Sequence, residues 1–158
     1  LLELIRTLAR STGGIGLRSA IRVIQDVLVD KSRVLGADAV KLADRDIGSL
    51  ACVDDFYDTL KADIAKVLPH VIGGVEKTMK IFGADAFEVR VAKAVAALQP
   101  VETFPRTAEN IAALLYRTVG SPGLLDQVRE ALRKRMRPYR GPPGGRLGVS
   151  QRRGQTDP

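Results

Sequence analysis

The chain has 158 residues, 45% of them apolar, so it can bury the core of one domain or of two small ones. The formal net charge is +7, but it is unevenly distributed. Up to Leu132 there are 17 basic and 17 acidic residues, and from Arg133 onward there are 8 basic residues and one acidic residue, so a uniformly basic body is excluded. A single cysteine, Cys52, excludes an internal disulfide, and no apolar stretch approaches the ~20 residues that span a bilayer. We expect a cytoplasmic globular chain, not a membrane protein, and, as it starts at Leu1 rather than Met, a piece of a longer one.

Apolar residues recur at helical rather than alternating spacing, so the sequence predicts an all-α fold. A first helix over residues 2–8 ends before a glycine-rich turn at residues 13–16. A second, over residues 17–32, carries Arg18 and Arg22 on its polar face, and Arg22 can pair with Asp26 one turn on. Its predicted buried stripe consists of Leu17, Ala20, Ile21, Ile24, Val27 and Leu28.

Residues 32–53 favour turns around one short apolar piece. Asp54 or Asp55 then caps a helix that ends at Pro69, because proline disfavours the helical conformation in the residue before it. Two more helices follow, over residues 70–82, closed by Gly83, and over residues 86–98.

Two helices are predicted after residue 100. Thr107 caps the first, which stops at Gly120, and Ser121 and Pro122 start the second, which runs to Arg135. Separated by a tight Gly-Ser turn, they form a helix-turn-helix candidate. Residues 137–158 interleave proline and glycine with arginine, and this composition predicts a disordered basic tail.

Several catalytic patterns have simpler explanations. The glycines after Thr12 and the Tyr57-x-x-x-Lys61 spacing are similar to a short-chain dehydrogenase, but no strand or βαβ pattern accompanies them. His70 is expected at the surface and Cys52 as a small buried hydrophobe. The acidic pairs Asp44/Asp46 and Asp54/Asp55 are interpreted as turn and cap residues, with metal binding a remote second choice.

The segment from Gly16 to Ile24 resembles the lid-helix opening of AAA+-type P-loop ATPases, in which a Gly-x-x-Arg turn starts a helix whose arginine reaches the nucleotide γ-phosphate. The segments from Phe104 to Leu115 and from Val119 to Leu132 are similar to the region after the lid in large BREX phage-defence ATPases of the BrxC/PglY type. The resemblance covers roughly residues 13–134. It implies a lid-like bundle over residues 1–100 and an incomplete winged-helix unit over residues 101–136.

The resemblance further implies that Arg18, or next Arg22, senses ATP, and that the remainder of the ATPase or a neighbouring subunit is the partner. No G-x-x-x-x-G-K-[ST] loop is present, so this chain is not expected to hydrolyse ATP by itself. Two alternatives stay open: a helical adaptor that binds a partner protein through an apolar groove, and a DNA or other nucleic-acid binder. The latter would use the tail together with Arg117, Arg129, Arg133, Lys134 and Arg135.

Overall fold

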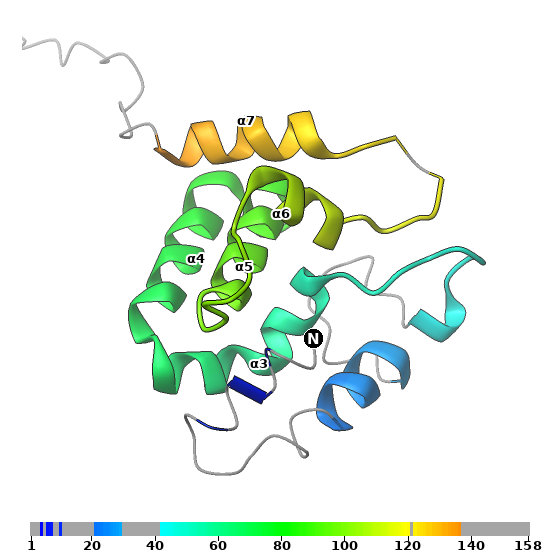
Figure 1. The fold of residues 1–158 in the computed structure, drawn as a ribbon, viewed down its shortest axis with the longest axis horizontal. Coiled ribbons are helices and arrows are strands. Elements are labelled where there is room, and N and C mark those ends of the chain that lie inside the picture. The colour runs from blue at the N-terminus through cyan, green and yellow to red at the C-terminus, as the bar shows by residue number, and fades with distance from the viewer. Residues whose placement is uncertain are drawn as a thin grey trace, which may run out of the picture.

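The computed structural model describes residues 4, 6, 7, 10, 21–29, 42–120 and 122–136. These residues confirm the all-α class, because the extended pairing among them is limited to one isolated antiparallel bridge between Ser49 and Thr118 (Figure 1). The elements in chain order are the π-helix η1 (Gln25–Val29), the 3-10 helix η3 (Leu42–Asp44), and the α-helices α3 (Val53–Val67), α4 (Pro69–Phe82), α5 (Phe87–Leu98), α6 (Ala108–Leu114) and α7 (Leu125–Met136).

The C-terminal ends of α3, α4 and α5 lie within two residues of the predicted ones, and local residues set those of α3 and α4. α3 ends at Val67, and Pro69 is the first residue of α4, where its missing N–H has no intrahelical partner to lose. Gly83 caps α4 with a φ of 90°, a conformation that residues with a Cβ rarely adopt.

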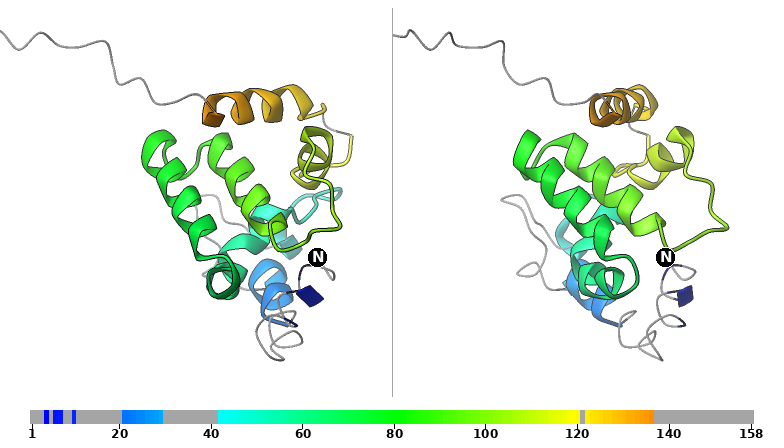
Figure 2. Two further views of the ribbon diagram at one scale, coloured as in Figure 1. Left: turned by 60° about the vertical axis from the view of Figure 1, so that its left-hand side comes forward. Right: turned by 90° about the vertical axis from the view of Figure 1, so that its left-hand side faces the viewer.

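Helix α5 lies at the centre of the described fold. It packs against α3, α4, α6 and α7, and α7 lies across one end of the α4–α5 pair (Figures 1 and 2). Small side chains on α5 permit this close packing, because Ala92, Ala94 and Ala97 are completely buried. The same core contains Leu60 of α3 and Val128 of α7, so it includes residues from both sides of residue 100. The domain boundary at residue 100 stays a prediction.

The helix over residues 21–29 shows that the predicted apolar stripe is wrong in part. Val23 and Val27 are buried, whereas Ile21 and Ile24 are 55% and 53% exposed. The buried face also contains Asp26, whose carboxylate accepts a hydrogen bond of 2.9 Å from the Thr59 hydroxyl of α3. The helix therefore buries the face that carries Asp26, which bonds to Thr59. The predicted Arg22–Asp26 pair does not form.

The connection between α6 and α7 differs from the predicted tight turn. α6 already ends at Leu114, and α7 begins only at Leu125, so Pro122 is not its first residue. Between them the chain is extended where Thr118 forms a bridge with Ser49. The prediction was wrong because a contact with a distant segment replaces the last turn of the helix.

Thr107 caps α6 as predicted, and its removal gives a measurable effect. Its hydroxyl oxygen accepts a hydrogen bond of 3.2 Å from the backbone N–H of Asn110. We expect Thr107→Ala to lower the free energy of unfolding by about 1 kcal/mol, the usual value for a lost N-cap. Urea denaturation checks this against Thr103→Ala, which removes an exposed threonine outside any helix and should leave the midpoint in place.

Candidate functional site

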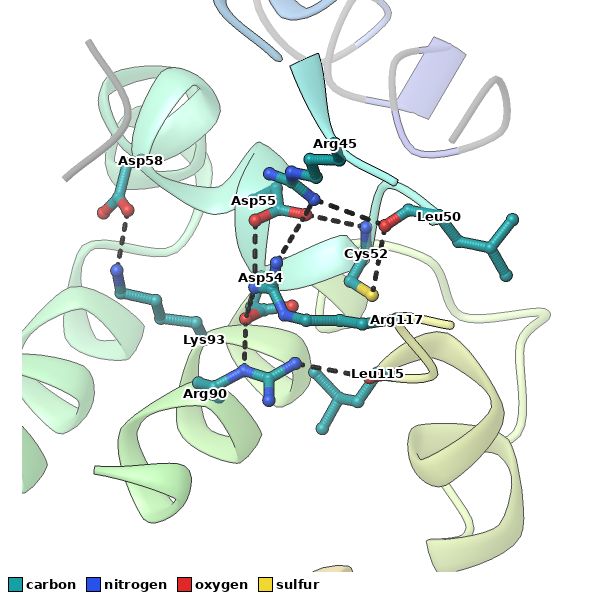
Figure 3. Close-up of polar contacts among 10 residues, drawn as sticks. All are labelled: Arg45, Leu50, Cys52, Asp54, Asp55, Asp58, Arg90, Lys93, Leu115 and Arg117. Atoms are coloured by element: carbon teal, nitrogen blue, oxygen red, sulfur yellow. Dashed lines mark hydrogen bonds and ion pairs between the residues drawn. The ribbon is translucent and has the colours of Figure 1, made fainter. Parts of the chain in front are cut away.

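Five charged side chains meet where α3 begins, and we call them the acid–arginine cluster. The Asp54 carboxylate accepts from Arg90 Nε at 2.7 Å and from Arg117 Nη2 at 2.8 Å. The Asp55 carboxylate accepts from Arg117 Nη2 at 2.9 Å and lies 3.7 Å from Arg45 Nη1 (Figure 3). Both carboxylates are 4% exposed, so water screens these ion pairs poorly.

The local sequence explains why the two carboxylates stand at this helix end. Cys52 is the N-cap residue of α3, and its backbone N–H donates to Asp55 Oδ2 at 2.8 Å. Acidic side chains in the first turn also interact favourably with the positive end of the helix dipole. The prediction that Asp54 or Asp55 is the N-cap is therefore wrong, because Cys52 holds that position and both aspartates lie in the first turn of α3, and it missed the arginines that both residues bind.

The arginines of the cluster come from distant parts of the chain. Arg90 belongs to α5, and its Nη2 also donates to the Leu115 carbonyl at 3.3 Å. Arg117 belongs to the extended segment after α6. Burial lowers the pKa of Arg117, but the Asp54 and Asp55 carboxylates outweigh it and raise the pKa above its ordinary value. The cluster therefore ties α5 and the α6–α7 connection to the start of α3.

Three potential metal ligands lie at the same place, the start of α3, but their electrostatic surroundings disfavour binding of a metal ion. Ligand atoms of Cys52, Asp54 and Asp55 lie within 4.8 Å of one another. Burial, and next the Asp54 charge, raise the pKa of the Cys52 thiol to about 11, whereas a metal binds the thiolate. Three guanidinium groups already neutralise the two carboxylates. The corner is therefore better suited to holding the fold together than to binding a cation.

The Tyr57-x-x-x-Lys61 pattern lies on α3, with its two residues one helical turn apart, as predicted. The Lys61 ammonium pairs with Glu76 at 3.0 Å on the protein surface. Tyr57 is 1% exposed, and its burial raises its pKa to about 12. The buried hydroxyl has no hydrogen-bond partner among the described residues, so Tyr57 acts as a core residue rather than as a proton donor to a substrate.

The two predicted nucleotide-sensing residues have different outcomes. Arg18 lies outside the described residues. Arg22 is exposed, and in the described part of the chain its side chain has neither an ion pair nor a hydrogen bond. Ile21 and Ile24 of the same helix are also exposed, whereas Val23 and Val27 are buried. The 21–29 helix therefore exposes a cation and two apolar side chains.

The residues predicted to bind nucleic acid make internal ion pairs wherever their side chains are described. Arg117 belongs to the acid–arginine cluster, Arg129 pairs with Glu109 at 2.9 Å, and Lys134 pairs with Glu88 at 2.9 Å. Arg133 lies 3.7 Å from Glu130 on the same helix. The side chain of Arg135 and the predicted tail, residues 137–158, lie outside the described part of the chain.

His70 is exposed and Cys52 is buried, both as predicted.

No protein-family model, curated protein or solved structure matches the chain. Over the residues that the structure describes, every helix is too short or too polar to cross a membrane. A functional assignment must therefore come from the residues themselves.

Proposed function

We propose that this chain is the non-catalytic lid and following helical part of a large P-loop ATPase of the phage-defence type, which responds to ATP through an arginine of the lid helix. One observation carries the proposal. Arg22 is exposed, and its side chain is unpaired among the described residues, on the 21–29 helix, for which the resemblance of residues 16–24 to a lid helix implies a sensor. A guanidinium without an internal acid is available to a phosphate, which it binds through two parallel hydrogen bonds.

The surroundings of Arg22 suit a surface that another part of the ATPase covers. Ile21 and Ile24 are each more than half exposed, and burying them against a nucleotide-binding body would remove apolar area from water. Exclusion of water at the same time strengthens the attraction between arginine and phosphate. The proposal therefore gives one function to the cation and to its two apolar neighbours.

The helix that carries Arg22 is firmly attached to the rest of the bundle. Val23 and Val27 pack into the core, and the Asp26 carboxylate is hydrogen-bonded to Thr59 in a buried position. A movement of the helix on nucleotide binding would therefore move α3 with it. Such rigid attachment is what a lid requires if it is to convert the presence of a γ-phosphate into a rotation.

The nucleic-acid alternative has less support from the described contacts. Arg117, Arg129 and Lys134 each bind a carboxylate of the chain at 2.9 Å or less. A phosphate would have to displace these carboxylates, so binding to DNA through α7 would break existing ion pairs. The exposed Ile21 and Ile24 are compatible with a protein-binding adaptor, and ATP dependence distinguishes that function from a lid.

ATP turnover of the complete ATPase that contains this chain tests the proposal. Arg18→Ala and Arg22→Ala are made separately, and we expect at least one to lower turnover on the order of tenfold, because a charge that answers the γ-phosphate is lost. Lys77→Ala is the matched control, since Lys77 is an exposed cation on α4 that is likewise unpaired in the described part of the chain. Its turnover should equal that of the unchanged protein.

Unchanged turnover in both arginine variants would contradict the sensor function. The encoding DNA offers an independent check, because the proposal expects a G-x-x-x-x-G-K-[ST] loop upstream of Leu1 in the same reading frame.

A further inference from the structure

We infer that the first turn of α4, residues 69–72, is a flap that opens about the Gly73–Gly74 pair while the rest of the bundle stays folded. The inference is independent of the proposed ATPase function. It rests on the weak attachment of this turn, on the two glycines that follow it and on the firm attachment of the helix beyond them.

The first turn of α4 lacks the side-chain contacts that usually stabilise the start of a helix. Its N-cap residue is Leu68, whose side chain cannot accept a hydrogen bond, and the turn contains no acidic side chain. Pro69 and His70 are exposed, and the side chain of His70 makes no hydrogen bond or ion pair in the described part of the chain. The side-chain contacts of the turn are therefore those of Val71 and Ile72, which are partly buried against the core.

The two glycines that follow weaken α4 at one point. In a helix interior glycine is less favourable than alanine, because it loses more conformational freedom on folding. The surroundings of Gly73 do not require a glycine, since its φ is not positive and a Cβ there would have no neighbour within 4 Å beyond the adjacent residues and the helix backbone. The Thr78 hydroxyl donates to the Gly74 carbonyl at 2.8 Å, a bond to the preceding turn that tends to bend a helix. The glycine pair is therefore the point at which α4 bends most easily.

Beyond the glycines, α4 is firmly attached to the bundle. The two buried residues of α4, Val75 and Thr78, both belong to this part, and Met79 packs against the core. On the surface, Glu76 pairs with Lys61 of α3 at 3.0 Å. The change from weak to firm attachment therefore coincides with the glycine pair, so the first turn can move while residues 75–82 stay in place.

Opening of the flap changes the surface of the bundle. Val71 and Ile72 leave the core against which they pack, and their apolar side chains become accessible to water. Because this exposure is unfavourable, the closed turn is the ground state and the open turn a minor state. The flap therefore presents an apolar surface transiently, without unfolding of the other helices.

Hydrogen exchange of the whole chain, followed residue by residue by NMR at urea concentrations below the unfolding transition, tests the flap. In an α-helix the N–H groups of residues 73–76 donate to the carbonyls of residues 69–72, so opening of the flap releases them. Corrected for intrinsic exchange rates, we expect these N–H groups to exchange on the order of tenfold faster than those in the middle of α5. Their exchange should also be insensitive to urea, because a local opening exposes little surface.

Gly73→Ala tests the position of the hinge. If Gly73 leaves the helical conformation during opening, the variant should slow exchange of residues 73–76 about fivefold, which corresponds to the ~1 kcal/mol gained when alanine replaces glycine in a helix interior. Gly123→Ala is the matched control, because a Cβ at Gly123 also has open space and Gly123 lies outside the helices. It should leave the exchange of residues 73–76 unchanged.

Exchange of residues 73–76 at the rate of α5, with the same dependence on urea, would overturn the inference, because these groups would then open only when the whole chain unfolds. Faster exchange that Gly73→Ala leaves unchanged would overturn the hinge at the glycine pair. Since none of these measurements involves ATP, the result is separate from the test of the sensor function.

Discussion

Replacing Asp54 with alanine is expected to lower the free energy of unfolding by about 3 kcal/mol, the lower end of the range for breaking a buried ion pair from one side. The variant removes the carboxylate that binds both Arg90 and Arg117, and it leaves Arg90 without an acid partner among the described residues. The lower end applies because the side chains of Arg90 and Arg117 are 25% and 37% exposed, so water partly solvates the charges left behind.

Urea denaturation followed by circular dichroism measures this loss. Asp85→Ala is the control, because Asp85 is an exposed acid with no ion pair in the described part of the chain, and its removal should change the free energy of unfolding by less than about 0.5 kcal/mol. Equal stability of the two variants would mean that the acid–arginine cluster does not hold α3, α5 and the α6–α7 connection together.

Leu60→Ala is expected to lower the free energy of unfolding by about 3 kcal/mol, within the range measured for large-to-small changes in protein cores. Leu60 is completely buried on α3, which packs against both α4 and α5. The variant loses the transfer free energy of the removed carbons and leaves a cavity that rigid helices fill only in part.

Ile81→Ala on α4 provides the matched comparison, because it also shortens an aliphatic side chain within a helix but at a position that is 46% exposed. Its effect should stay below about 1 kcal/mol, since little apolar area returns to water. A Leu60→Ala protein as stable as Ile81→Ala would show that α3 is not part of a tightly packed core.

The sequence predicted the elements whose boundaries depend on neighbouring residues. Pro69, Gly83 and Thr107 each act on the backbone within one helical turn, and the structure confirms the helix ends that they imply. The all-α class was predictable for the same reason, because helical spacing of apolar residues is a local pattern. The burial of Cys52 and the exposure of His70 followed from their surroundings in the chain.

The features that the sequence did not predict depend on residues far apart. Val119 fits a helical continuation of α6, yet its segment becomes extended because the backbone bonds to residues 48–50 and Arg117 binds Asp54 and Asp55. The outward position of Ile21 and Ile24 similarly depends on Thr59, which hydrogen-bonds Asp26 across 33 positions of the chain. Adjacent aspartates at a helix start give no indication of which distant arginines will meet them.

The pairing of Asp54 with Arg117 has a consequence for the order of folding. These residues are 63 positions apart, so their contact closes a long loop. The chain loses conformational entropy when this loop closes, and this cost opposes formation of the ion pair. The hairpins that join α3 to α4 and α4 to α5 close much shorter loops and can therefore assemble first. Docking of the segment after α6 is then a late step in folding. Mutations that weaken this docking should raise the unfolding rate and leave the refolding rate nearly unchanged.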